Sequence, residues 1–157
     1  MTISQERVVD YLDDQVVDVI ETVSEQGIEF NVSLNVGGMG AHIIRERDDG
    51  PLIVVGVIRL EGEHLELFMD LSENQRMNYL SQIGAVLTNS PGLYRFTDGE
   101  GNDVDYGRLE AVRVEDRIYP DGFSQDRLMN SVYDLIQSLY YVKTMTNVFM
   151  SNIQGQR

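Results

Sequence analysis

Hydrophobic side chains near the start of the chain recur with the period of a helix. Over Gln5–Glu25 an apolar residue follows at every third or fourth position, and aspartates and glutamates fill most positions between them. Thr2 or Ser4 can cap such a helix, and Gly27 can end it. The pattern predicts an amphipathic first helix over Gln5–Glu25. Its apolar positions are Val9, Leu12, Val16, Ile20 and Val23.

From Ile28 the period changes to two, which indicates strands. Apolar and polar side chains alternate over Ile28–Val36, as in a half-buried strand, and Ala41–Arg47 follows as its hairpin partner. Pro51–Leu60 is apolar on both faces and predicts a central strand. His64–Met69 is predicted as a further short strand or as an extension of the preceding one. This part of the chain therefore predicts three or four consecutive strands.

Three glycines, Gly37, Gly38 and Gly40, close the first of these strands and invite comparison with a phosphate-binding loop. Such a loop needs its glycines between a strand and a helix. Here a second strand follows, and the spacing fits neither a dinucleotide fingerprint nor a P-loop. We therefore predict a hairpin turn in which glycine supplies positive φ angles.

A capping box marks the start of a second helix. Ser72 and Gln75 can each accept a hydrogen bond from the other's backbone amide, and the sequence NSPG at Asn89–Gly92 ends the helix. Its apolar stripe is Met77, Leu80, Ile83, Gly84 and Leu87.

Two strands and a long helix complete the chain. Leu93–Thr97 and Leu109–Tyr119 predict a second hairpin, and Ser124 caps a helix that runs to about Met150. Because strands linked by hairpins pair antiparallel, we expect an α+β fold with a mostly antiparallel sheet and its helices on one face or end. The element order is α-β-β-β(-β)-α-β-β-α. No linker divides the chain, so residues 1–157 are predicted to form a single domain.

The last helix has more apolar surface than one sheet can cover. It is about 40 Å long at 1.5 Å per residue, whereas strands of about seven to ten residues span about 23–34 Å. Apolar side chains at its far end could then bind a partner, for which methionine-rich surface is well suited. The alternative, that another helix of the chain covers them, stays open. These side chains are Tyr141, Met145, Val148, Phe149 and Met150.

Acidic residues outnumber basic ones by 26 to 12, which gives a net charge of −14, and Lys143 is the only lysine. Abundant acid with almost no lysine is typical of proteins that work in concentrated salt, such as those of halophilic archaea. At molar salt the screening length is about 3 Å, so that the self-repulsion of such a chain is suppressed. An acidic surface evolved for a basic partner is the alternative.

The composition also excludes several classes of function. Binding to nucleic acid without sequence preference, or to an anionic membrane, needs clustered basic residues, and the chain has no such cluster. It contains no cysteine, which excludes disulfides, thiolate zinc sites and cysteine nucleophiles. We recognise neither a signal peptide nor an apolar run long enough to cross a membrane, and expect a cytoplasmic protein.

Two patterns resemble metal sites but depart from them. The acidic loop Asp98–Gly107 alternates oxygen ligands like a calcium loop, but Asp103 and Leu109 stand where a glycine and a bidentate glutamate are required. His42 and His64 do not have the spacing of zinc ligands. We therefore expect no metal, no other cofactor and no catalytic set.

Four arginines form a candidate anion site. Arg45 and Arg47 share a face of one predicted strand, and Arg113 and Arg117 share a face of a later one. If the two strands were neighbours, the four guanidinium groups could line a site for an anion or an acidic peptide. Glu115 lies on the same face between Arg113 and Arg117, so cross-strand pairing of arginine with glutamate explains the pattern without a ligand.

The order of elements resembles that of the type III secretion chaperone-like fold, and of small archaeal domain families of unknown function that share it. The likeness covers nearly the whole chain and lies in topology, without a matched motif; an extra strand at His64–Met69 would depart from it. It implies a dimeric protomer that binds another polypeptide and catalyses nothing. In such chaperones the client covers the first helix and the sheet, here Val9–Val23 and Ile28–Val36, and the second helix pairs the protomers. The implied dimer residues are Met77, Leu80, Ile83 and Leu87.

Two functional hypotheses follow from these observations. The leading one is a non-catalytic, cytoplasmic and dimeric protein-interaction module, chaperone- or adaptor-like, with an unknown client. The second is a small anion- or nucleotide-binding regulatory domain that uses the arginine face. Neither hypothesis involves nucleic acid or a membrane as partner.

Overall fold

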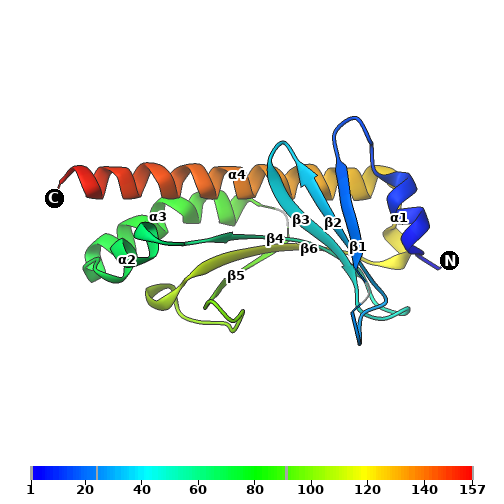
Figure 1. Cartoon of the computed structure of the whole chain (residues 1–157), viewed down its shortest axis with the longest axis horizontal. Coiled ribbons are helices and arrows are strands. Elements are labelled where there is room, and N and C mark those ends of the chain that lie inside the picture. Colours follow the sequence, from blue (N-terminus) through cyan, green and yellow to red (C-terminus); the bar gives the residue numbers. More distant parts are fainter. Residues whose placement is uncertain (1, 24, 91, 157) are drawn as a thin grey trace. The chain divides into compact units, whose positions relative to one another are not determined.

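The computed structural model describes residues 2–23, 25–90 and 92–156 (Figure 1). Its six strands form one sheet in the order β1-β2-β3-β4-β6-β5, and the pairs β1–β2, β2–β3 and β3–β4 are antiparallel. The predicted α+β class with a mostly antiparallel sheet is therefore confirmed. The elements are α1 (Gln5–Tyr11), β1 (Asp18–Val23), β2 (Phe30–Val36), β3 (Met39–Arg45), β4 (Leu52–Arg59), α2 (Glu63–Met69), α3 (Glu73–Asn89), β5 (Leu93–Thr97), the 3₁₀ turn η1 (Tyr106–Arg108), β6 (Ala111–Ile118), the 3₁₀ turn η2 (Pro120–Gly122) and α4 (Gln125–Gly155).

The chain divides into two compact units. Unit 1 comprises residues 1–56 and 115–137, and unit 2 comprises residues 57–114 and 138–157, so that β4, β6 and α4 each contribute residues to both. Both units bury large apolar side chains. Examples in unit 1 are Val8, Val32, Leu34, Ile43 and Leu128, and examples in unit 2 are Phe68, Tyr79, Ile83, Leu139 and Phe149.

The glycine-rich stretch is a hairpin turn, as the sequence predicts. Val36 of β2 pairs with Met39 of β3, which leaves Gly37 and Gly38 as a two-residue turn with φ angles of 58° and 88°. Both angles lie in the left-handed region, which glycine enters without steric cost. The backbone amide of Gly38 also donates to the Asn35 side-chain oxygen at 3.0 Å. The loop therefore serves the register of the sheet.

The first helix is shorter than the sequence predicts. α1 ends at Tyr11, and the carbonyl of Asp13 then accepts hydrogen bonds from the amides of Val16 and Val17 in a turn. Beyond it, Asp18–Val23 pairs with β2 as strand β1. The prediction of a helix over Gln5–Glu25 is therefore wrong after Tyr11; Ser24 lies outside the described residues. The valines and isoleucine of β1 favour a pleated edge, and pairing with β2 prevails over their helical spacing.

His64–Met69 is also misassigned by the sequence, because Glu63–Met69 is helix α2. Gly62, at a φ of 54°, turns the chain out of β4, and glutamate, leucine and methionine are strong helix formers. The helix buries Leu67 and Phe68. The first half of the sheet therefore contains four strands because β1 precedes β2, and not because a strand follows β4.

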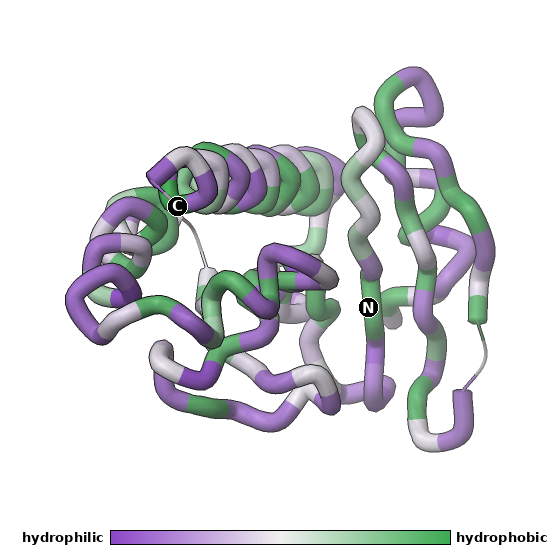
Figure 2. The backbone as a smooth tube through the Cα atoms, turned by 60° about the vertical axis from the view of Figure 1, so that its left-hand side comes forward, coloured by the Kyte–Doolittle hydropathy of each residue, from purple (hydrophilic) through white to green (hydrophobic). Residues whose placement is uncertain are grey.

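The predicted helix starts in the second half are confirmed. Ser72 Oγ accepts a hydrogen bond from the Gln75 backbone amide at 3.2 Å, and Gln75 Oε1 accepts one from the Ser72 backbone amide at 3.0 Å, which completes the capping box of α3. Ser124 caps α4 through the amide of Arg127 at 3.1 Å. The helix continues to Gly155, past the predicted end, and hydropathy alternates along it (Figure 2). Pro91, in the stop signal predicted after α3, lies outside the described residues. Among the residues that the structure describes, no helix is both long enough and hydrophobic enough to span a membrane.

Asp116 joins β6 to the start of α4 within unit 1. Its carboxylate accepts two hydrogen bonds from Arg127, at 2.8 and 3.1 Å, and one from Ser131 Oγ at 2.7 Å. The amide of Arg117 donates to it as well, at 2.9 Å. Burial by itself would raise the pKa of Asp116, but the hydrogen bonds and the charge of Arg127 outweigh burial, and the pKa is lowered. The ionised carboxylate is therefore the form that the fold stabilises.

We expect Asp116→Asn to lower the free energy of unfolding at neutral pH by about 1–3 kcal/mol, since hydrogen bonds to a charged group are lost. A lowered pKa in the folded state gives stability that is present above the unfolded pKa and disappears as the pH falls through the folded one. The difference in free energy of unfolding between wild type and variant should therefore disappear as the pH falls below about 4. Urea denaturation at constant ionic strength over this pH range measures it. The exposed Asp121 gives a matched control, Asp121→Asn, and a gap that persists unchanged in acid would contradict the assignment.

Candidate interaction surfaces

A clasp of three side chains holds the end of α1 in unit 1. Arg7 donates to the Tyr11 hydroxyl from Nη2 at 2.7 Å and from Nε at 3.0 Å. Its guanidinium lies 5.1 Å from the centre of the Tyr11 ring and 5.3 Å from that of Phe123, and the two rings stack at 5.3 Å. Gln125 of α4 also donates to the Tyr11 carbonyl at 3.2 Å. The end of α1 is thereby fixed beside the start of α4.

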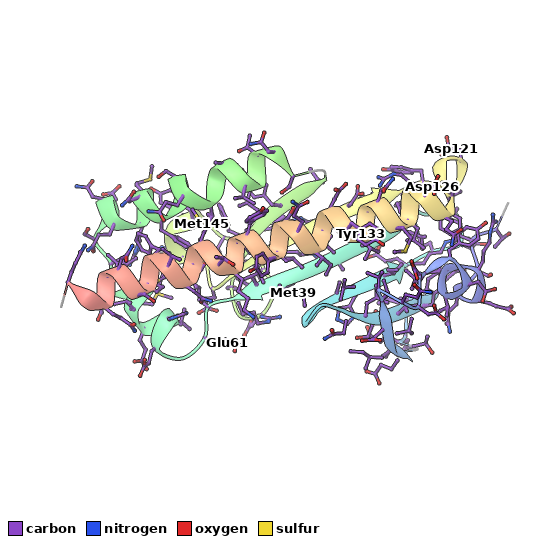
Figure 3. The ribbon with its side chains drawn as sticks, turned by 90° about the horizontal axis from the view of Figure 1, so that it is seen from above. Met39, Glu61, Asp121, Asp126, Tyr133 and Met145 are labelled. Atoms are coloured by element: carbon purple, nitrogen blue, oxygen red, sulfur yellow. The ribbon has the colours of Figure 1, made fainter. Side chains whose placement is uncertain are left out.

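An open groove of about 720 Å³ lies between the turn after α1 and the first turns of α4. Leu12 and Met129 are both buried and supply an apolar floor, and the amide of Asp13 contacts Met129 Sδ at 3.4 Å. Tyr133 contributes a ring that is 42% exposed. Side chains on α4 line the groove at helical spacing, and Figure 3 marks two of them, Asp126 and Tyr133. The lining residues are Val9, Asp10, Leu12, Asp13, Asp14, Gln125, Asp126, Met129 and Tyr133.

The rim of this groove is acidic. Four aspartates, all exposed, surround the apolar floor. Asp13 already accepts a hydrogen bond from the amide of Gln15 at 3.0 Å, so its carboxylate also stabilises the turn. An apolar side chain that enters the groove would therefore be surrounded by negative charge. The four rim residues are Asp10, Asp13, Asp14 and Asp126.

The sequence did not reveal this groove, because the predicted helix ran through the turn that forms one of its walls. The signal was present in Asp13 and Asp14, two consecutive residues that favour turns and helix ends over helix interiors. The client region expected from the chaperone resemblance, Val9–Val23, contributes Val9, Asp10, Leu12, Asp13 and Asp14 to the lining. The contribution of Gln125–Tyr133 could not be foreseen from sequence, since α4 is more than a hundred residues away along the chain.

Strand β1 offers a second exposed surface in unit 1. It lies at the edge of the sheet, and Ile20 is 62% exposed. A bulge between Val19 and Glu21 interrupts its register with β2, and Asp18 and Glu21 place charges along it. Bulges and charges are the devices by which proteins prevent an edge strand from pairing with another chain. β1 is therefore a protected edge and a weaker candidate for partner binding than the groove.

The structure does not bring the four candidate anion-binding arginines onto one shared face. Arg45 is only 1% exposed; it donates to the carbonyls of Ile3 and Asp48 and lies 3.6 Å from Glu29. β3 ends at Arg45, which leaves Arg47 outside the strand. β4 also separates β3 from β6 in the sheet, so the strands that were to form the site are not neighbours.

The remaining arginines have carboxylate partners or belong to the other unit. Arg47 pairs with Asp49 at 3.4 Å, with both side chains exposed. Arg117 pairs with Glu115 of the same strand at 3.0 Å. Arg113 belongs to unit 2, whereas the other three arginines belong to unit 1.

The predicted partner-binding residues of α4 are divided between core and surface. Phe149 and Met150 are buried, Met145 is half-buried, and Tyr141 is 47% exposed. The Phe149 ring lies 5.3 Å from the ring of Tyr79, whose hydroxyl is 2.8 Å from Thr146 Oγ1. Burial raises the pKa of Tyr79, and the hydrogen bond with Thr146 opposes that rise in part. This cluster is ordinary core of unit 2.

The predicted dimer residues on α3 are divided in the same way. Ile83 and Leu87 are buried, Leu80 is half-buried, and Met77 is 46% exposed. Only Met77 is well placed to meet a partner without rearrangement of the core.

The candidate metal ligands are committed to local structure. Asp98 accepts hydrogen bonds from the amides of Glu100 and Asn102 and from the Asn102 side chain, and the bonds from Asn102 are the main reason that its pKa is lowered. His42 Nδ1 lies 3.0 Å from the Asn31 side-chain oxygen. Within residues 2–23, 25–90 and 92–156, no three carboxylate or imidazole groups are gathered so that they could hold a metal ion.

Comparison with known proteins assigns a family. A family model of uncharacterized conserved proteins, DUF2299, matches residues 4–146. The chain belongs to the DUF2299 family. A crystal structure of an uncharacterized protein from Methanothermobacter thermautotrophicus is similar to this DUF2299 member, with a TM-score of 0.75 and 21% sequence identity over 92% of this chain and 97% of the other. At that identity the likeness shows a shared fold. No curated protein matches the chain in sequence.

Two neighbouring residues of α4 should differ sharply in their effect on stability. We expect Phe149→Ala to lower the free energy of unfolding by about 3–5 kcal/mol, because it opens a cavity beside Tyr79. The adjacent Val148, which is 51% exposed, provides the control, and Val148→Ala should change stability by no more than about 0.5 kcal/mol. Urea denaturation of the two variants gives both values. Similar losses for the two would show that the burial of this helix is misassigned.

Proposed function

We propose that this DUF2299 protein is a non-catalytic polypeptide-binding module, chaperone- or adaptor-like, whose client occupies the α1–α4 groove of unit 1. The groove is the observation that carries the proposal. It combines an apolar floor, an acidic rim and a volume of about 720 Å³, which is within the usual range for binding pockets of roughly 300–1,000 Å³. Its wall is held in place by the clasp of Arg7, Tyr11 and Phe123.

The chemistry of the groove selects the kind of client. An apolar side chain can bury itself against Leu12, Met129 and Tyr133, and a neighbouring lysine or arginine can pair with the aspartates of the rim. A client rich in acidic residues would be repelled by the same carboxylates. We therefore propose a segment in which apolar and basic residues occur together.

The relative contributions of the apolar floor and the acidic rim to client binding should depend on the salt concentration. At about 0.1 M salt charges act over about 10 Å, whereas at about 1 M the range falls to about 3 Å. If the protein works in the cytoplasm of a salt-adapted cell, as its charge and its single lysine suggest, the apolar floor provides most of the binding energy there. The charges of the acidic rim are then screened for attraction and repulsion alike, and the rim acts only through direct contacts with the client.

We do not propose that the protein binds an anion or a nucleotide through the four candidate arginines. Arg45 is buried against backbone carbonyls, and Arg47 and Arg117 each pair with a carboxylate. No observation favours a ligand over these internal partners.

Synthetic peptides of matched length can test the proposal. One peptide combines leucines with lysines, and its counterpart carries glutamate at every lysine position. In fluorescence anisotropy at about 0.1 M KCl we expect the basic peptide to bind more tightly by at least about tenfold, or about 1.4 kcal/mol. Neutralising the rim with Asp14→Asn and Asp126→Asn together should remove most of that preference. Asp121→Asn, whose exposed carboxylate precedes α4 outside the groove (Figure 3), should leave it unchanged.

A second variant tests the floor. Tyr133→Ser removes an exposed ring from the groove. It should lower the affinity for the basic peptide at about 0.1 M KCl and also at about 1 M KCl, where the rim charges are screened. Equal binding of the acidic and basic peptides, or a loss with Asp121→Asn as large as with the rim variant, would refute the groove as the client site.

A further inference from the structure

The second half of α4 presents an exposed face without a single carboxylate. No aspartate or glutamate follows Asp134 in the sequence, although the chain has 26 acidic residues. Of the exposed residues of α4 in unit 2, only Lys143 is charged. Three of the others are large: Tyr140, Tyr141 and Val148 are 58%, 47% and 51% exposed.

A helix face without carboxylates is unusual in a chain with 26 acidic residues, and the exposed part of α3 after Glu73 is a second such face. In a protein with a net charge of −14, acidic residues are expected at exposed helix positions, as at Asp126 and Asp134 in the first half of α4. Uncharged surface with aromatic side chains is instead typical of the centre of a protein–protein contact, from which charged residues are depleted. The face therefore fits a partner that is itself uncharged at the point of contact.

The sequence of this face is also complementary to itself. The exposed positions Tyr141, Thr144, Val148, Ser151 and Gly155 follow one another at spacings of three and four, the spacing of a helix–helix seam. Side chains are large at the start of this stripe and small at its end. Beside Gly155, a methyl group would meet no atom within 4 Å, so the space above it is open. An antiparallel second copy would place each Tyr141 over the partner's Gly155, with the two copies of Val148 at the centre.

We propose that the protein forms a two-fold dimer in which the α4 segments Ser138–Gly155 of two copies pack antiparallel, centred on Val148. A second copy is the occupant that satisfies both observations. It brings no carboxylate to the contact, and its small end matches the large end of the first. The remaining acidic surface repels between copies, so the dimer should tighten as salt rises. The inference concerns unit 2 and is independent of the client groove.

Because the native chain contains no cysteine, single cysteines can test the register. A disulfide needs Cα atoms about 4.4–6.8 Å apart. Val148→Cys lies on the proposed two-fold axis and should cross-link to itself under mild oxidation. Two copies of Tyr141→Cys would be about 21 Å apart along the helices and should not. A mixture of Tyr141→Cys with Gly155→Cys should yield the mixed dimer. Equal self-cross-linking at positions 141 and 148 would indicate parallel pairing and overturn the proposal.

Sedimentation equilibrium of the full chain at about 1 M KCl tests the interface without cross-linking. We expect wild type to be dimeric, and Val148→Glu to raise the dimer dissociation constant by about a hundredfold, because two carboxylates would be buried face to face. Met77→Glu, at an equally exposed position of α3, is the matched control and should remain dimeric. Unchanged circular dichroism would establish that Val148→Glu is folded.

Each remaining outcome rejects the proposal. A wild-type monomer at all concentrations would show that the face binds some other neutral partner or none. A dimer that survives Val148→Glu but dissociates with Met77→Glu would place the interface on α3.

Discussion

The stacking of Tyr11 on Phe123 is the contact on which the candidate client site depends. These residues are far apart in the chain, and the Arg7 guanidinium lies over both rings while it donates to the Tyr11 hydroxyl. Cation–π contacts and ring stacking are each worth about 0.5–1.5 kcal/mol. They act here at the point where α1 ends and the chain must turn. Without them, the turn carrying Asp13 and Asp14 would be held beside α4 mainly by the hydrogen bond from Gln125 to the Tyr11 carbonyl and by the contact of the Asp13 amide with Met129.

The sequence predicted local structure well where one residue type has one physical solution. Gly37 and Gly38 adopt positive φ angles that other residues avoid, and Ser72 with Gln75 satisfies two backbone amides that would otherwise have no partner. The prediction failed where a pattern has two solutions. Ile20 and Val23 have the spacing of a helix, yet valine and isoleucine also suit an edge strand, and pairing with the neighbouring strand β2 decided the outcome. His64–Met69 failed for a related reason, since too few residues were available to distinguish the two periods.

The candidate sites were harder to foresee because each depends on segments that the fold brings together. Phe149 and Val148 are adjacent in sequence and both apolar, but Phe149 packs against Tyr79 in the core whereas Val148 is exposed. Arg45 looked like a ligand-binding residue on a strand face, whereas the carbonyls of Ile3 and Asp48 and the carboxylate of Glu29 surround it. Charge was read from sequence as a property of the whole chain. The absence of acidic residues after Asp134 is visible in the sequence, but which of those positions are exposed, and which aspartates gather at the groove, required the structure.

If the client groove and the α4 dimer face function as proposed, the two surfaces respond to salt in opposite ways. A basic client in the acidic groove is attracted by charge, so screening weakens that part of its affinity. Two copies meeting at an uncharged helix face are hindered by the charge of the rest of the molecule, so screening strengthens their association. In concentrated salt, the chain would therefore be most fully dimeric under the conditions in which its client is held mainly by the apolar floor. If both proposals hold, one dimer presents two grooves, and a client with two suitable segments gains affinity by binding both. The protein could then hold an extended client firmly even though each groove binds a single segment weakly.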